Sequence, residues 1–342
     1  MRPTLFLLFM ILRGYAMGQG LFEFAGRSIK PGETASVKIS VQTISGDSTF
    51  IPVTIIHGRE KGPVLGLIAG IHGYEYPPIM ALQKLRSNIN AADLRGTIIL
   101  VQIANVKSFF GRSVFYSPVD GKNLNRSFPG SKSGTLTEAL AYTISNEIIS
   151  RCGYLIDIHA GDASEDLHPY VTYYKYGTQT DKAKQIAEAL NFPWIIVSEN
   201  APKQGQPTVY CSAESVSHDI PTVAIEYGKL GQVTAEEATF IQERLKDMMV
   251  AMGMLKGSPK KITPGIEIRK RMSITSEHTG IFYPETKSGE LIRKGARLGI
   301  ITGVFGEVLQ EVLSPVDGFV IYLSATPPIS KGETLFSLGT FE

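Results

Sequence analysis

Short apolar runs alternate with helical segments through the first three quarters of this 342-residue chain, and this alternation limits the fold most. Each run has the length of a strand and is flanked by Gly or Pro. Strands that are apolar on both sides belong to a mostly parallel sheet that helices cover on both faces. The sequence therefore predicts an α/β domain with a mostly parallel mixed sheet. The runs are residues 64–69, 97–104, 155–159 and 221–226.

Two capping boxes mark the starts of helices, Thr135 with Glu138 and Thr234 with Glu237. They predict one helix over residues 135–149 and a second from residue 234 onward. Further helical segments are expected over residues 79–85 and 182–190, and strands over residues 20–56.

After residue 255 the chain changes character. A charged linker is followed by short strands and Gly turns without a helical period. Residues 314–320 resemble the repeated half of a barrel-sandwich hybrid, the fold of biotinyl and lipoyl carriers, but no lysine occupies the carrier position. We therefore predict a small all-β, barrel-sandwich-like domain that is not a carrier. The predicted bounds are residues 20–255 for the main domain and 266–342 for the β domain.

The first residues resemble a secretory signal, with a positive start, an apolar run over residues 5–12 and two small residues, Ala16 and Gly18, before a cleavage point. The run is too short to span a membrane. We predict removal of residues 1–18 and a secreted or periplasmic location. If translation begins at Met17 instead, we expect a cytoplasmic location.

The composition of the chain limits the classes of binding partner that we expect. The chain is 43% hydrophobic and 19% charged, with a net charge of +2. These values are typical of a globular protein and predict neither a nucleic-acid nor a membrane partner. The two cysteines, Cys152 and Cys211, form neither a zinc cluster nor a disulfide framework, and whether they pair stays open. A zinc ion would therefore need His and carboxylate ligands.

Two of the apolar runs lead to a histidine. His72 follows the run at residues 64–69, and one turn of helix would bring Glu75 to the same side. Alone, this pair is a weak indication of a metal site, and a helix-start His with a surface Glu is the more common explanation. His159 ends a second strand at the same edge of the sheet, however, and catalytic zinc takes three such ligands and keeps a fourth position open. We predict a zinc site on His72, Glu75 and His159.

Two carboxylates belong to the same predicted edge. Asp157 faces the same way as His159 and either holds that imidazole or is satisfied by the backbone. Glu226 is either a general base for water on the metal or a salt-bridged structural residue. His168 is a fallback ligand. The histidines expected to be ordinary surface or core residues are His57, His218 and His278.

Residues 105–134 are polar and rich in Gly and Pro, which predicts a long loop. Loops of this length in a compact domain are often functional. Arg126 in this loop is either solvated or available to bind a substrate carboxylate through its guanidinium fork. Arg112 is a candidate for stabilising an oxyanion.

Four segments occur in the order and approximate spacing of the succinylglutamate desuccinylase/aspartoacylase family, and the chain resembles that family over most of its length. This family belongs to the carboxypeptidase-A-like zinc hydrolase superfamily. The most specific segment is Asn-Leu-Asn-Arg-Ser-Phe-Pro-Gly, which follows His-Gly-Tyr-Glu. The C-terminal β domain also looks like one that many members append. The four segments are residues 72–75, 123–130, 157–159 and 225–228.

The resemblance implies roles for particular residues. One zinc ion per chain would be held by His72, Glu75 and His159. The catalytic residues would be Glu226, as general base and proton shuttle, and Arg112, which would polarise the scissile carbonyl. The substrate-binding residues would be Asn125 and Arg126, on a carboxylate, and Tyr283, in place of a tyrosine from the C-terminal domain of aspartoacylase.

We therefore predict a zinc-dependent deacylase that cleaves the amide bond of an N-acyl amino acid or a similar small carboxylate-bearing molecule. One alternative is a carboxypeptidase-type enzyme for peptides or cell-wall fragments, which a secreted location favours. Another is a catalytically silent binding protein, against which the intact His72, Glu75, His159 and Glu226 argue. The acyl group, the amino acid and the formation of a homo-oligomer stay open.

Overall fold

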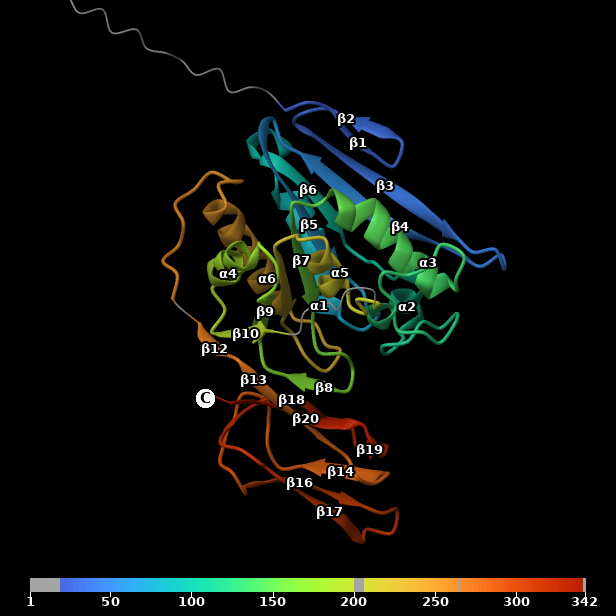
Figure 1. Ribbon diagram of the computed structural model, residues 1–342, viewed down its shortest axis with the longest axis vertical. Coiled ribbons are helices and arrows are strands. Elements are labelled where there is room, and N and C mark those ends of the chain that lie inside the picture. The colour runs from blue at the N-terminus through green and yellow to red at the C-terminus, as the bar shows by residue number, and fades with distance from the viewer. Residues whose placement is uncertain (1–18, 200–205, 264, 341–342) are drawn as a thin grey trace, which may run out of the picture.

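The computed structural model describes residues 19–199, 206–263 and 265–340. Its main part is built on a nine-stranded mixed sheet (Figure 1). Neighbouring strands are parallel except at β9–β11, β6–β4 and β4–β3. The order across the sheet is β12 (Ile266–Ile268), β10 (Trp194–Ser198), β9 (Tyr170–Tyr174), β11 (Thr222–Glu226), β7 (Tyr154–His159), β5 (Glu60–Ala69), β6 (Arg95–Val101), β4 (Ser48–His57) and β3 (Glu33–Gln42).

Strand β5 shows why the apolar runs form the centre of this sheet. Leu65 and Leu67 enter the core on one face, and Ile68 enters the core on the other. All three side chains are fully buried. Each contributes roughly 1.5–3 kcal/mol of hydrophobic stabilisation, so a strand of this composition is stable only where helices cover both faces.

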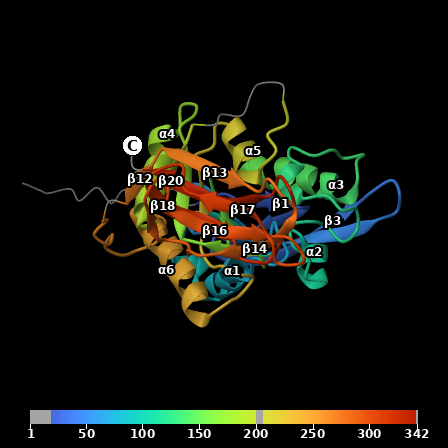
Figure 2. The ribbon, with the colours of Figure 1, turned by 90° about the horizontal axis from the view of Figure 1, so that it is seen from below.

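Helices cover both faces, as Figure 2 shows for α1 and α6 on one side and α3 and α5 on the other. The helix predicted over residues 135–149 is present as α3, then a π-helical turn (Ile144–Ile148) and a 3₁₀ turn (Ile149–Arg151). Cys152 and Cys211 are buried and do not pair. The helices are α1 (Tyr76–Asn88), α2 (Val106–Gly111), α3 (Leu136–Thr143), α4 (Thr180–Ala189), α5 (Cys211–Ser217) and α6 (Ala235–Ala251).

The C-terminal region is all-β, as predicted, and lies below the large sheet in Figure 1. It consists of two antiparallel sheets around a core that includes Phe282 and Phe336. The barrel-sandwich shape stays a prediction. The first sheet contains β13 (Lys270–Thr275), β20 (Thr334–Thr340), β18 (Gly318–Ser324) and β15 (Leu291–Ile292). The second contains β17 (Val308–Leu313), β16 (Arg297–Thr302), β14 (Gly280–Pro284) and β19 (Pro328–Ile329).

The predicted start of the β domain at residue 266 needs a correction. Residues Ile266–Ile268 form β12, which pairs in parallel with β10 at the edge of the large sheet. The composition of this short strand predicts that it belongs to the β domain, but its pairing with β10 places it in the main domain. The C-terminal sheets therefore begin at β13, and a single residue, Arg269, separates β13 from β12.

The two parts are joined by shared secondary structure. Strand β8 (Glu165–Leu167), from the main domain, pairs antiparallel with β18. Beside it, the rings of Trp194 and Phe319 stack with centroids 4.2 Å apart. Asp166 accepts hydrogen bonds from both the backbone N–H and the hydroxyl of Ser288. These contacts fix the C-terminal region against the carboxyl edge of the large sheet.

Near the N-terminus, β1 (Phe22–Phe24) and β2 (Arg27–Ile29) form a hairpin. The predicted signal segment, residues 1–18, lies outside the described residues, so removal of that segment stays a prediction. Within the described residues, none of the helices combines the length and apolar character that a membrane span requires.

Candidate functional site

His72 and Glu75 lie in a tight turn between β5 and α1. The expectation that a turn of helix joins them is wrong, because α1 begins only at Tyr76, with prolines in its first turn. The turn depends on two glycines. Gly70 has φ +71°, and a Cβ at Gly73 would lie 2.3 Å from the carbonyl oxygen of Ser108.

This turn and the end of β7 bring three side chains together. Nδ1 of His72 lies 2.6 Å from Oε1 of Glu75, and Nδ1 of His159 lies 2.9 Å from Oε2 of the same carboxylate. All three residues are buried, and one ligand atom from each lies within 4.8 Å of the others. The structure therefore brings the three predicted ligands into one group that could hold a metal ion.

The second nitrogen of each imidazole has its own partner. Nε2 of His72 lies 3.1 Å from Oδ1 of Asn123, and Nε2 of His159 lies 3.0 Å from Oδ1 of Asp157. In this structure each Nδ1 donates its proton to the Glu75 carboxylate. Both Nε2 partners are acceptor oxygens, the Asp157 contact being at ion-pair distance without hydrogen-bond alignment, so they would hold a proton on Nε2 if a metal ion replaced the proton on Nδ1. Both imidazoles thus present the correct nitrogen for a metal at the Glu75 carboxylate.

The electrostatics of the group favour positive charge at its centre. Burial opposes ionisation of Glu75, but the adjacent His159 and His72 outweigh burial and lower its pKa. Burial works against the charged imidazoles in the same way, yet Glu75 raises the pKa of His72, and Asp157 with Glu75 raises that of His159. A divalent cation would supply the positive charge that the carboxylates attract.

Glu226 ends β11 in register with His159 on β7 and Tyr170 on β9. Burial raises its pKa to about 8; the positive charge of His159 opposes this shift, and the negative charges of Glu75 and Glu165 add to it. Within the described residues, Glu226 forms no ion pair, which argues against the salt-bridged structural alternative.

The long loop folds over the same edge through a 3₁₀ turn (Leu124–Arg126). Oδ1 of Asn125 accepts a hydrogen bond from the backbone N–H of Cys211 at 2.9 Å, which fixes the side chain of Asn125. The exposed guanidinium of Arg126 lies 4.7 Å from the centre of the Tyr210 ring and donates to the carbonyl oxygen of Asn125. In the described part of the chain it pairs with no carboxylate, so most of its donors are available to a ligand.

These residues face one cleft of about 2360 Å³ between the large sheet and the C-terminal region. The main domain contributes Glu226, Arg126 and the three candidate ligands His72, Glu75 and His159, called the metal-binding group below for the ion they could hold. The C-terminal region contributes Arg271 and Tyr322. The site is therefore built by both parts of the molecule.

Comparison with known proteins agrees with this geometry. Residues 61–252 match the family model of the succinylglutamate desuccinylase/aspartoacylase catalytic domain. The chain belongs to the succinylglutamate desuccinylase/aspartoacylase family. This membership confirms the resemblance identified from the sequence, and it places the protein in a family of deacylases.

Related members are similar over nearly the whole chain. An N-alpha-acetyl-L-2,4-diaminobutyric acid deacetylase from Halomonas elongata is 30% identical over 302 residues, which cover 84% of this chain and 85% of the relative. A product-bound ectoine utilization protein from Ruegeria pomeroyi has a TM-score of 0.80 at 23% identity, with 91% of this chain and 97% of that chain covered. A family member from Rhodobacter sphaeroides has a TM-score of 0.77 at 22% identity, with 90% and 95% covered. The two solved structures share the fold of this chain.

Two residues that the family resemblance implied do not reach the cleft. Arg112 is exposed at the C-terminal cap of α2 and is absent from the cleft lining; the chain turns there, and Phe115 lines the cleft instead. Tyr283 lies on β14 in the sheet that does not pair with the main domain, is 50% exposed and is also absent from the lining. Tyr322, on the sheet that pairs with β8, lies at the cleft.

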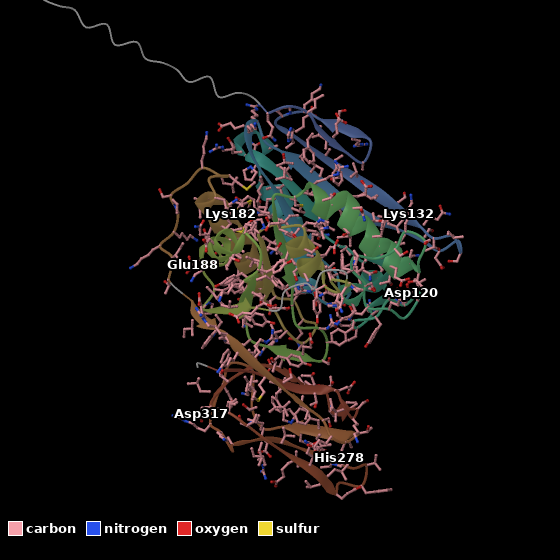
Figure 3. The ribbon with its side chains drawn as sticks, viewed as in Figure 1. Asp120, Lys132, Lys182, Glu188, His278 and Asp317 are labelled. Atoms are coloured by element: carbon pink, nitrogen blue, oxygen red, sulfur yellow. The ribbon has the colours of Figure 1, made fainter. Side chains whose placement is uncertain are left out.

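The other histidines lie away from the metal-binding group. The ring of His168 packs edge-on against Trp194 and Phe319 at the junction between the two parts, which we call the seam. The prediction of His168 as a fallback ligand is therefore wrong. His57 is buried against Thr97, and His218 pairs with Glu214. Figure 3 shows His278 at the far end of the C-terminal region.

Sequence reasoning missed several residues that line the cleft. Asn123 begins the segment 123–130 on which the family resemblance depends, and that membership was the available signal for a partner of His72. The segment after His159 contributes the carboxylate of Glu165 to the cleft, and the density of acidic residues there was the available signal. Tyr322 had no signal, because only the pairing of β8 with β18 brings it to the site.

Proposed function

We propose that this protein is a zinc-dependent deacylase that hydrolyses the amide bond of N-acyl amino acids bearing a free carboxylate. The observation that carries the proposal is the convergence of three buried ligands, His72, Glu75 and His159, on one cleft with Glu226 and Arg126. The name of the Halomonas relative, which deacetylates a small N-acyl amino acid, supports the same substrate class.

The donor set fits zinc. Two imidazole nitrogens and one carboxylate are the ligands of many catalytic zinc sites, and the acceptors on Nε2 of both rings orient the donors. When bound, a zinc ion polarises a carbonyl and lowers the pKa of a coordinated water to roughly 7. The remaining steps depend on side chains of this chain.

Glu226 is the proposed general base. It lies beside His159 across the β7–β11 pair, and its carboxylate is not held by a cation within the described residues. It accepts a proton from the attacking water at the carboxylate oxygen and then delivers that proton to the leaving amine nitrogen. A water O–H bond and the amide C–N bond break, and a carboxylic acid and an amine form.

Arg126 and Asn125 are proposed to orient the substrate. The Tyr210 ring lies against one face of the Arg126 guanidinium, and the donors that the Asn125 carbonyl does not use would bind a carboxylate. The backbone bond that fixes Asn125 limits movement of the loop. Binding of the substrate carboxylate by Arg126 would orient the amide bond of the substrate toward His72, Glu75 and His159.

A second candidate, a carboxypeptidase-type enzyme, is favoured by one observation. The cleft volume of about 2360 Å³ exceeds the roughly 300–1,000 Å³ of most small-molecule pockets. A peptide would fill more of this space than an acetylated amino acid.

The deciding experiment compares N-acyl amino acids with di- and tripeptides on zinc-loaded protein, each as the free acid and as the C-terminal amide. We expect the highest kcat/KM for N-acyl amino acids with a free carboxylate. Faster turnover of the peptides would contradict the proposed deacylase activity and support the peptidase activity. No turnover of any compound by protein that holds zinc would contradict both.

A further inference from the structure

The outermost strand of the large sheet has a free edge. Strand β3 is ten residues long and, within the described residues, pairs only with β4. Figure 1 shows β3 at the end of the sheet opposite to β12. An exposed strand edge of this length carries unpaired N–H and C=O groups, so it is a template for a further strand.

The side chains along this edge are incompletely covered. Val37 and Ile39 face the core that α3 covers, opposite Val53 and Ile51 on β4. The two β4 residues are fully buried, whereas Val37 and Ile39 are only half-buried because no described strand lies outside β3. A further strand would cover this apolar surface, and β-branched pairs across strands stabilise a sheet.

A lysine usually protects such an edge, because its charge disfavours pairing when it points outward. Lys38 is the lysine of β3, and its Nζ lies 4.5 Å from the centre of the Phe50 ring on β4. The charge therefore lies over the face of the sheet, and the edge of β3 stays accessible.

A groove of about 510 Å³ lies between β3, β4 and α1. Its lining includes the apolar residues Pro52 and Ile103 and the cations Lys38 and Arg86. Within residues 19–199, 206–263 and 265–340, neither cation has an Asp or Glu at ion-pair distance. The groove thus combines apolar surface with two positive charges that lack a carboxylate partner.

The turn between β3 and β4, residues 43–47, has complementary features. Ile44 in this turn is 87% exposed. Asp47 accepts a hydrogen bond from the hydroxyl of Ser45 at 3.0 Å, and in the described part of the chain no cation lies at ion-pair distance from its carboxylate. Figure 2 shows this end of β3 extending past α3. The turn therefore presents an apolar side chain and a negative charge at a projecting end.

We propose that β3 is the interface of a two-fold dimer, in which β3 pairs antiparallel with β3 of a second copy and each turn 43–47 enters the other copy's groove. This inference does not depend on the proposed function. A patch that contains both the groove and the turn that fits it is self-complementary, as a two-fold interface requires.

The spacing along β3 places the two-fold axis near Ser40. Ser40 lies midway between Ile44 and Ser36, and Ser36 lines the groove. An antiparallel pair centred on Ser40 therefore brings the partner's Ile44 beside Ser36. The same register places Ile39 opposite the partner's Val41. The partner's turn then carries its carboxylate toward the two cations of the groove.

The test measures the molecular mass of the purified protein by sedimentation equilibrium at micromolar concentrations, where the wild type should be a dimer. Ile44→Asp puts a charge where an apolar side chain would be buried, so it should raise the dimer dissociation constant by about 10-fold or more. Phe305→Asp is the matched control. Phe305 is 94% exposed in the turn between β16 and β17, so its replacement should leave the dimer unchanged.

Charge reversal tests whether the turn meets the groove. Asp47→Lys and Lys38→Glu should each weaken the dimer, and the double variant should recover part of the lost affinity because the two charges attract again. None of the changed residues lines the cleft, so all variants should bind zinc as the wild type does.

A monomeric wild type would overturn the inference and leave the groove to a different anionic partner. A dimer that neither Ile44→Asp nor the single charge reversals weaken would show that another surface forms it, and would also overturn the inference. A double variant that is no tighter than either single variant would contradict the placement of the turn in the groove.

Discussion

The large sheet and the C-terminal β region line the same cleft but contribute to it in different ways. The large sheet supplies His159 and Glu226 from the carboxyl ends of β7 and β11, and His72 and Glu75 from the turn after β5. The C-terminal region supplies residues such as Tyr322 from the middle of a strand.

We therefore expect the main domain to carry the proposed catalytic groups and the C-terminal region to affect mainly substrate recognition. Residues at the strand ends lie beside one another because parallel pairing aligns those ends, so the reacting groups depend on the main domain alone. Residues of the C-terminal region reach the cleft because contacts such as the β8–β18 pair and the Trp194–Phe319 stack dock that region there. Changes in the first set should abolish catalysis, whereas changes at the seam should have smaller effects.

The largest effect is expected from the metal-binding group. His159→Ala or Glu75→Ala should lose the zinc and lower kcat by at least ~10³-fold, because Lewis-acid catalysis contributes several kcal/mol. Metal analysis and steady-state kinetics measure both. His278→Ala, at the far end of the C-terminal region in Figure 3, is the control and should keep the metal. Full zinc occupancy in the first two variants would contradict the ligand assignment.

Removal of the general base should have the next largest effect. Glu226→Gln keeps the shape of the side chain but cannot accept a proton, so kcat should fall by ~10²–10⁴-fold with zinc retained. Single-turnover kinetics and metal analysis on one preparation test this. A kcat near that of the wild type would make Glu226 a structural residue.

A moderate effect is expected at the cationic subsite. Arg126→Ala should lower kcat/KM for free-acid substrates, with a loss of transition-state stabilisation of about 2 kcal/mol, because the substrate carboxylate loses its charged partner. Amide-capped substrates should lose much less. Arg112→Ala is a matched control, since that arginine is exposed outside the cleft lining. Equal losses for both kinds of substrate would show that Arg126 does not bind the carboxylate.

The smallest effect is expected at the seam. Burial opposes ionisation of Asp166, but Lys229 and the two hydrogen bonds from Ser288 outweigh it and hold the pKa of Asp166 below its usual value. The resulting stabilisation is complete above the pKa of the unfolded state and is lost as the pH falls through the lower folded pKa. Asp166→Asn should therefore lower the free energy of unfolding by about 1–2 kcal/mol near neutral pH.

This difference between Asp166→Asn and the wild type should begin to shrink below about pH 4, where the carboxyl is protonated first in the unfolded state and, at lower pH, in the folded state. Thermal unfolding at several pH values measures it. A difference that stays constant down to pH 3 would mean that the shape of the side chain, and not its charge, holds the two parts together.

Local sequence was sufficient to predict many of the strands and helices of the main domain. Leu65, Leu67 and Ile68 identify a strand buried on both faces, because an apolar run of that length has no other stable environment. His159 and Glu226 could be placed at one edge, since each ends such a run. The metal ligands followed from this argument without knowledge of the register.

Only the tertiary structure decided the contents of the cleft beyond those strand ends. Glu165 and Tyr322 come together through one antiparallel pair between segments that are distant in the chain, and no local pattern specifies such a pairing. Arg112 is closer in sequence to the site than Tyr322, yet the left-handed turn at the end of α2 leaves it outside. Local sequence determines strands and helix starts through hydrophobic burial and capping, whereas side-chain placement across a domain seam depends on which surfaces dock.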